Sequence, residues 1–437
     1  MTDVGVYILF IGVLIFLGHL FFRIFILTRI PDLLLLMLFG ILIGPVLGLV
    51  SPDSFGVFGT IFPTLTLIII LFEGGLNLKI DTVLSTFRDA TALTFFNFFT
   101  TLGVSAYLIY TILGYPVIPS LIFGAILGAT SSAVVIPLLP QLRLREESRT
   151  ILSIESAFSD VISIVVVLTL LKIATSPDVD FFSLTETFFL SVLLALFFGL
   201  LAALGWAVIR KRFQIFDSLF STPAFMFIIY GLLEMSGISG AIGVLTFGIT
   251  LGNMDYFKPR VFTENFNMYI LNRRDFDPGE IELNSTERFF FAEIVFLFKT
   301  FFFIYIGISM HFLETPVIMA GILLTLLLYL LRIPVIWASI PKNTPKWDAG
   351  IMAIMVPKGL AAAVLASLPL QAGITGGEFI RDTVFAVIFF SITVNAALIF
   401  LIDRTPVKRI YNLFFTEYGR ENNNSKGEQN VPSGRGG

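Results

Sequence analysis

The sequence predicts an all-α protein that crosses a membrane many times. Of its 437 residues, 56% are hydrophobic and 14% are charged, and the mean hydropathy is +0.91. The apolar runs are continuous over about 20 residues, which is the length that spans a bilayer as a helix. Membrane β-barrels instead show short segments in which polar and apolar residues alternate. With no cysteine and two histidines, the chain lacks the residues for disulfides and for thiolate or histidine-built metal centres.

Hydropathy predicts about thirteen spans. They lie near 4–27, 31–50, 58–77, 88–113, 117–137, 151–175, 183–209, 217–236, 238–253, 290–310, 315–338, 348–369 and 379–402. The chain starts without a basic segment and its first apolar run is long, so we expect a membrane span there and not a cleaved signal peptide.

The placement of Lys and Arg predicts the orientation. These residues follow every odd-numbered span, as Arg210, Lys211 and Arg212 follow the seventh, and the intervening connections carry almost none. Positive loops face the cytoplasm. We therefore expect a multi-pass protein of the cell (plasma) membrane with its N-terminus outside and its C-terminus in the cytoplasm.

Two strings recur along the chain. Residues 39–45 (FGILIGP) resemble residues 247–253 (FGITLGN), and residues 71–75 (LFEGG) resemble residues 304–308 (IYIGI). Each pair lies seven spans apart. Because seven is odd, the partners cross the membrane in opposite directions, which is typical of inverted-topology repeats.

The predicted organisation is one transmembrane domain over residues 1–405. Its first repeat covers 4–175, its second covers 217–402, and the helix at 183–209 links them. We expect residues 254–288 to form a cytoplasmic loop. Residues 406–437 should form a cytoplasmic tail, and the polar, Gly-rich composition predicts disorder from about residue 418.

Two spans in corresponding positions of the repeats are predicted to be broken. The fifth contains a small polar run, Gly128-Ala129-Thr130-Ser131-Ser132, and the twelfth contains Val356-Pro357-Lys358-Gly359. Proline removes a helical hydrogen bond and glycine weakens the next turn. Paired interruptions of this kind indicate the binding site of a transporter.

The sixth span carries two acids in its first turns, Glu155 and Asp160, together with Ser156 and Ser159. A charged side chain at membrane depth costs a few kcal/mol and marks a partner or a function. In a helix, residues four apart share a face, so Ser156 lies beside Asp160 and Ser159 beside Glu155. We expect Asp160 to hold a transported proton or metal ion and Glu155 to belong to the scaffold.

These features resemble the monovalent cation:proton antiporter superfamily, in its NhaP-like and sodium/proton-exchanger branch. The resemblance covers roughly residues 1–405. It is carried by residues 72–76 (FEGGL), 129–132 (ATSS), 155–160 (ESAFSD), 239–242 (SGAI) and 358–359 (KG).

The resemblance implies that Asp160 binds the ion, with the Ser156 side chain and the Thr130 carbonyl as further ligands. It also implies that Glu73 contributes a nearby carboxylate and that Glu155 pairs with Arg332. Interfacial snorkelling is the alternative for Glu73, and a role as second ligand is the alternative for Glu155.

Three positions depart from the pattern of the superfamily. Ser131 replaces an aspartate, Ser159 an asparagine and Lys358 an arginine. The two serines either ligate the ion or satisfy backbone groups at the break. We expect Lys358 to neutralise helix ends or to balance Asp160, and Lys299, inside the tenth span, to face the core and stabilise a carboxylate.

The predicted function is a secondary active antiporter, not an enzyme, that exchanges Na+ or Li+ for H+ one for one by alternating access and serves pH homeostasis. The resemblance implies a core of spans 3–6 and 10–13, a dimerisation domain of spans 1–2 and 8–9, and a homodimer. The expected partners are membrane lipids and monovalent cations, with neither cofactor nor nucleic acid. The alternatives are K+/H+ exchange and a gated cation channel. An intramembrane enzyme is a third alternative, but the sequence shows no nucleophile–base pair that would support it.

Overall fold

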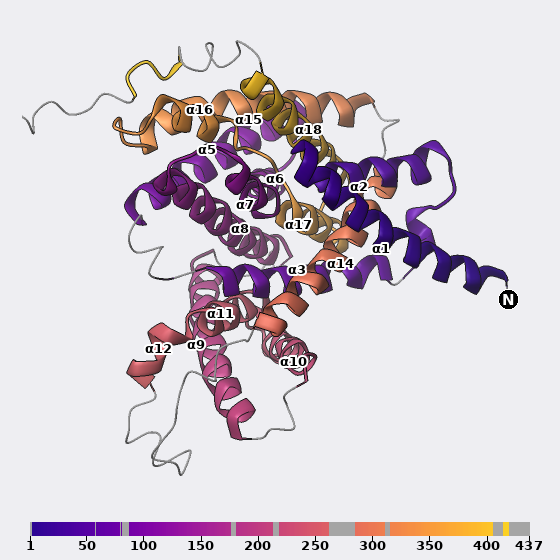
Figure 1. Ribbon diagram of the computed structural model, residues 1–437, viewed down its shortest axis with the longest axis vertical. Helices are drawn as coiled ribbons and strands as arrows, with labels where there is room; N and C mark the ends of the chain where they lie inside the picture. Colours follow the sequence, from indigo (N-terminus) through magenta and orange to yellow (C-terminus); the bar gives the residue numbers. More distant parts are fainter. Residues whose placement is uncertain are drawn as a thin grey trace, which may run out of the picture.

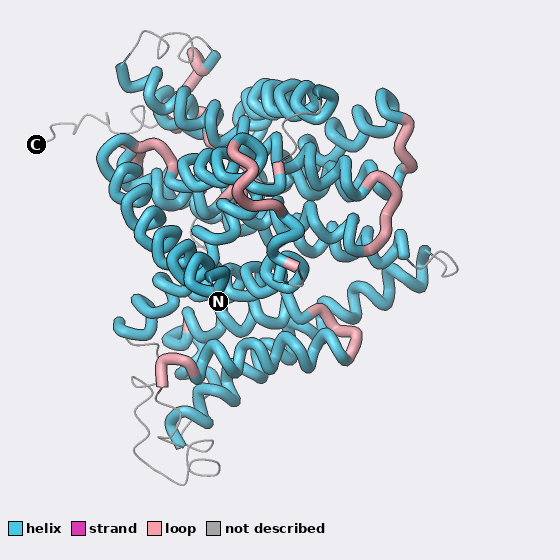
Figure 2. The backbone as a smooth tube through the Cα atoms, turned by 90° about the vertical axis from the view of Figure 1, so that its right-hand side faces the viewer, coloured by secondary structure: helices cyan, strands magenta, loops and turns pink. Residues whose placement is uncertain are grey.

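The computed structural model describes residues 2–56, 58–78, 80, 87–175, 181–212, 218–261, 285–310, 315–404 and 414–418. All regular secondary structure in these ranges is helical, as Figure 2 shows, so the predicted all-α fold is confirmed.

Eight helical segments are long and apolar enough to cross a membrane. They are α1 (Thr2–Thr28), α5 (Phe87–Leu113), the broken pair α6 (Val117–Gly128) and α7 (Ser132–Leu138), α8 (Glu146–Thr175), α9 (Phe181–Arg212), α14 (Ser285–Ser309), α15 (Thr315–Ser339) and α18 (Gly377–Arg404).

Five further apolar helices are shorter. They are α2 (Asp32–Ile41) with a π-helical turn at Leu42–Val46, α3 (Phe58–Asn77), α10 (Ser221–Met235), α11 (Gly240–Gly252) and α17 (Leu360–Gln371), which α16 (Lys346–Ile354) precedes. In chain order these elements follow the predicted spans, while the number of membrane crossings stays a prediction.

By their mutual contacts the helices pack in two groups, whose members are labelled in Figure 1. The core group consists of α5–α8 and α15–α18, and the scaffold group consists of α1–α3, α9–α11 and α14. Helix α17 also contacts α3 and so joins the groups. The expected division was wrong in one respect, because α3 and α14 were expected in the core: α3 packs along α11, and α14 packs along α2.

Glycines explain this packing. Gly40 on α2 faces Gly307 on α14, and a Cβ on either would overlap the backbone of the other helix. Gly75 on α3 and Gly248 on α11 meet in the same way. These glycines come from the two recurring strings, so the contact of α2 with α14 is reproduced by that of α11 with α3. Such duplication is what inverted repeats require, although the repeat boundaries stay a prediction.

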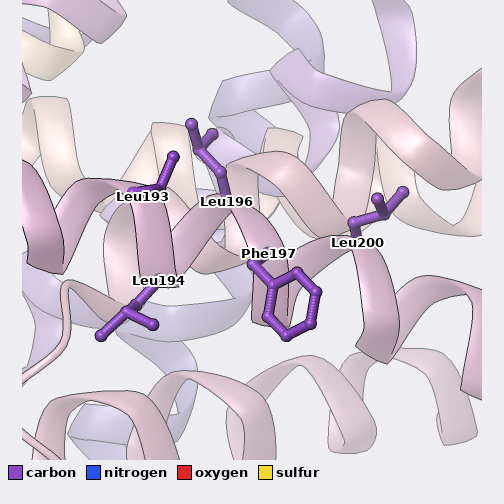
Figure 3. Close-up of a pocket in the computed structure, with 5 residues that line it drawn as sticks. All are labelled: Leu193, Leu194, Leu196, Phe197 and Leu200. Atoms are coloured by element: carbon purple, nitrogen blue, oxygen red, sulfur yellow. The ribbon is translucent and has the colours of Figure 1, made fainter.

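One surface hollow of about 440 Å³ lies along α9 and is lined by Leu193, Leu194, Leu196, Phe197 and Leu200 (Figure 3). Leu193 is 64% exposed and Phe197 53% exposed. With only apolar side chains in its lining, the hollow offers no oxygen ligands for a cation.

Part of the tail packs on the end of α15. The Tyr418 hydroxyl donates a hydrogen bond to the Ile336 carbonyl (3.0 Å), and the Trp337 indole donates one to the Phe414 carbonyl (3.1 Å). The disorder predicted from about residue 418 falls on residues 419–437, which lie outside the described residues. The predicted loop at 254–288 begins with α12 (Met254–Val261), and its residues 262–284 also lie outside them.

Candidate functional site

The two helix breaks touch each other. The Ser131 N–H donates to the Pro357 carbonyl (2.8 Å), and the Lys358 ammonium donates to the Ala129 carbonyl (2.8 Å). A Cβ at Gly359 would overlap the Ser131 side chain, so this approach requires glycine. Unpaired backbone groups are costly at membrane depth, and here each break supplies partners for the other.

Helix α8 lies against the first break and brings Asp160 to it. The Ser132 hydroxyl donates to Asp160 Oδ2 (2.7 Å), and the Thr130 N–H donates to the Ser159 hydroxyl (2.9 Å). Asp160 and Ser132 are partly exposed, whereas Ser159 is buried. The Asp160 carboxylate is therefore held beside unwound backbone.

Three other predicted ligands lie in or near this region. The buried Ser156 hydroxyl, one turn before Asp160, donates to the Ser153 carbonyl (3.0 Å). The Thr130 hydroxyl accepts a hydrogen bond from the Asn97 side chain (3.2 Å). Within the described residues, the buried Ser131 hydroxyl has no hydrogen-bond partner.

Glu155 has a different environment from Asp160. Both of its carboxylate oxygens accept hydrogen bonds from the Arg332 guanidinium, at 2.5 and 2.6 Å, and both side chains are fully buried. The Arg332 Nε also donates to the Met352 carbonyl near the end of α16 (3.1 Å). The expected ion pair is thus present in the structure, and it ties α8 to α15 and to the second broken span.

Two predicted residues lie in the scaffold group. The Lys299 ammonium on α14 pairs with Asp32 Oδ2 on α2 (2.9 Å), so the carboxylate expected for Lys299 is Asp32. Glu73 on α3 accepts a hydrogen bond from the Asn77 side chain (3.0 Å). In the described part of the chain, no hydrogen bond or ion pair joins Glu73 to Asp160.

Sequence reasoning missed three polar partners. Ser132 was treated only as part of the polar run, although its hydroxyl binds Asp160. Asn97 stands alone among four phenylalanines at 95–99, and an amide in such a run is a detectable signal. Asp32 follows a proline at the start of its span, where it resembles an interfacial residue.

The groups beside Asp160 that could bind a cation are oxygen atoms, and one of them, the Ala129 carbonyl, already accepts a hydrogen bond from the Lys358 ammonium. Beside the Asp160 carboxylate and the Ser132 hydroxyl lie the hydroxyls and carbonyls of the unwound residues 129–131. Hard alkali cations prefer oxygen ligands, which can replace part of their hydration shell. In the described residues, no group of three His, Cys, Asp or Glu side chains could hold a resident metal ion.

Comparison with known proteins identifies the family and the fold. Residues 11–402 match the family model described as sodium/hydrogen exchanger, transmembrane. Na(+)/H(+) antiporter 1 of Methanocaldococcus jannaschii is 31% identical over 158 residues, which cover 36% of this chain and 37% of that protein. K(+)/H(+) antiporter NhaP2 of Shewanella baltica is 25% identical over 387 residues, which cover 84% of this chain and 61% of that protein.

The chain therefore matches less than two thirds of the length of either of these relatives. Among solved structures, the sodium proton antiporter MjNhaP1 of M. jannaschii has the same fold, with a TM-score of 0.69 at 22% identity. That match covers 90% of this chain and all of the MjNhaP1 chain.

Proposed function

The chain belongs to the sodium/hydrogen exchanger family, and on that premise we propose that it is a secondary active antiporter that exchanges Na+ or Li+ for H+. The proton and the alkali cation compete for the Asp160 carboxylate, and alternating access carries the occupied site across the membrane.

The single observation that carries this proposal is the position of Asp160. Its carboxylate meets a neutral hydroxyl at a break in an apolar span, while the neighbouring acid, Glu155, is already neutralised by Arg332. A carboxylate in weakly solvated surroundings is stabilised by whatever neutralises it. A proton and an alkali cation both do so, and one carboxylate cannot hold both, which is the requirement for exchange.

The proposed cation ligands are Asp160, Ser132, Ser156 and the backbone and hydroxyl oxygens of Thr130. Ser131 is a further ligand, because its buried hydroxyl has no protein partner among the described residues. The contact of Ser159 with the Thr130 N–H supports a backbone-satisfying role for that serine. For Glu73 we propose a place on the approach to the site, since α3 contacts α17.

The two groups of helices support the proposal of alternating access. The core group carries both breaks and Asp160, and we propose that it moves against the scaffold group. We also propose a homodimer in the plasma membrane with its N-terminus outside. Crosslinking in native membranes tests the homodimer. Detection of the monomer alone would contradict it.

K+/H+ exchange is the second candidate. A relative named as a K(+)/H(+) antiporter matches 84% of this chain. In addition, the serines at positions 131 and 159 leave fewer strong oxygen ligands around the site, which favours a cation that is less tightly hydrated than Na+.

The test is exchange by the purified protein in liposomes that contain a pH dye, challenged in turn with Na+, Li+ and K+. We expect the cation-driven pH change to disappear in Asp160→Asn and to persist in Glu146→Gln, which removes an exposed carboxylate from the same helix. We also expect the apparent KM for the cation to rise as the pH falls, because protons then occupy Asp160.

Each other outcome has a meaning. Exchange that persists in Asp160→Asn would remove this residue from its role. Cation flux without a linked proton movement would instead support a gated channel. The cation with the lowest KM decides between Na+ and K+ exchange.

A further inference from the structure

The polar contacts at the first break have counterparts at the second break. At the first break, the Thr130 N–H donates to the Ser159 hydroxyl (2.9 Å), and this hydroxyl donates to the carbonyl of Ser156, three residues earlier (3.1 Å). At the second break, the Lys358 N–H donates to the Ser391 hydroxyl on α18 (3.0 Å). That hydroxyl also donates to the carbonyl three residues earlier, that of Ile388 (3.1 Å).

The correspondence continues one helical turn further. Four residues after Ser159, the Ser163 hydroxyl donates to the Ala125 carbonyl in α6 (2.8 Å). Four residues after Ser391, the Asn395 amide donates to the Ile354 carbonyl at the end of α16 (2.8 Å). All four side chains are fully buried. Each unbroken helix thus holds the adjacent broken span at two points, one within the interruption and one on the helix that precedes it.

The two breaks differ in the residue that is held. Thr130 lies beside the cation site, whereas Lys358 carries a fully buried ammonium that reaches across to the Ala129 carbonyl at the end of α6. The carbonyl end of a helix is the negative end of its dipole, so a cation there is stabilised. The ammonium offsets part of this negative potential. Its position therefore affects how much of the potential remains for a cation bound at the first break.

We propose that Ser391 is a positioning residue for cation binding, although it lies on α18 and its hydroxyl contacts the second break and not the first. By accepting the Lys358 N–H, its hydroxyl fixes the backbone from which the ammonium reaches Ala129. The Tyr329 hydroxyl on α15 donates to the Ser391 carbonyl (2.9 Å) and holds this part of α18 in turn. The inference rests on the proposed exchange function.

The experiment measures the KM for the cation that the wild type transports, in liposomes. It compares the wild type with Ser391→Ala, Lys358→Met and the double variant. Thr393→Ala is the control, because the Thr393 hydroxyl lies two residues away and donates to the Phe389 carbonyl four residues earlier.

We expect Ser391→Ala to shift the KM about tenfold, because the ammonium is then no longer held in place and the free energy at stake is of the size lost when a buried N–H loses its partner. Thr393→Ala should leave the KM unchanged. In the Lys358→Met background, the Ser391 substitution should have little further effect on the KM, because the ammonium that it positions is gone. A merely structural serine would instead add its full effect in both backgrounds.

Equal KM values for Ser391→Ala and Thr393→Ala, or strictly additive effects, would overturn the inference. If Ser391→Ala is not obtained as a monodisperse protein, Ser391→Cys keeps the packing and weakens the acceptor, and the same comparisons apply. The Asp160→Asn variant separates the two levels of proposal. Loss of exchange in Asp160→Asn together with an unchanged KM in Ser391→Ala refutes the inference alone, whereas exchange without Asp160 refutes the proposed function.

Discussion

Two acids on α8, five residues apart, have opposite surroundings. Glu155 is fully buried and accepts two hydrogen bonds from Arg332, while Asp160 is partly exposed and accepts one from a neutral hydroxyl. A carboxylate whose two oxygens are both paired with a guanidinium has little affinity for a further cation. Among the described residues no ion pair holds the Asp160 carboxylate, which therefore remains able to bind a cation beside the unwound backbone. This difference separates the structural acid, Glu155, from the proposed ion carrier.

The Glu155–Arg332 pair gives a prediction about stability. Removing one partner leaves a buried charge uncompensated, so Glu155→Gln and Arg332→Gln should each lower the free energy of unfolding by about 3–5 kcal/mol. The double variant should lose clearly less than the sum of the two. Thermal unfolding of the four proteins in detergent measures this, and strictly additive losses would mean that the two side chains do not interact in solution.

The sequence predicted the residues of this site better than their partners. Asp160 and the two breaks could be inferred as candidates, because charges in apolar spans and paired interruptions are rare and need explanation. The Glu155–Arg332 pair was implied by the resemblance to the antiporter superfamily. The hydrogen bond from Ser132 to Asp160 could not be inferred, since any of three small polar residues could have faced α8. Likewise, the sequence around Lys299 did not indicate that its ion-pair partner would be Asp32.

At the scale of elements, backbone contact through glycine determines which helices belong together. The strings at 71–75 and 247–253 were recognised as repeats of other strings, yet their meeting partners were not predicted. Similarity along a chain shows which elements are equivalent, whereas contact depends on which small residues face each other. For that reason α3 and α14 were assigned to the wrong group of helices.

Neighbouring glycines on α3 allow a matched test of this packing. A Cβ at Gly75 would lie 2.6 Å from the Leu245 carbonyl oxygen of α11, whereas a Cβ at Gly74 would meet nothing within 4 Å. Gly75→Ala should lower the free energy of unfolding by about 1–3 kcal/mol through overpacking. Gly74→Ala should leave it unchanged or raise it by up to about 1 kcal/mol, because alanine favours the helix. Equal melting temperatures for the two variants would contradict the close packing of α3 on α11.

At the scale of the whole molecule, contacts between distant connections agree with the predicted alternation of sides. Asp348 Oδ2 accepts from the Ser148 hydroxyl (2.7 Å) and thereby joins two connections that are both predicted to be cytoplasmic. The Arg210–Glu287 pair (2.6 Å) does the same. On the side predicted to be external, Tyr115 stacks on Phe379 with ring centroids 5.7 Å apart. A missed or added span between these segments would have placed them on opposite faces of the membrane.

These contacts show which connections lie together, and the charge bias predicts which face is cytoplasmic. Since the chain has no cysteine, one introduced thiol at a time can report its side. Ala372 and Glu147 are both exposed, and they lie in connections that are predicted to be external and cytoplasmic respectively. In intact cells, a membrane-impermeant maleimide should label Ala372→Cys and should reach Glu147→Cys only after permeabilisation. Labelling in the reverse order would show that the whole protein has the opposite orientation in the membrane. Labelling of both positions in intact cells would contradict the predicted alternation of sides, on which the inverted repeats depend.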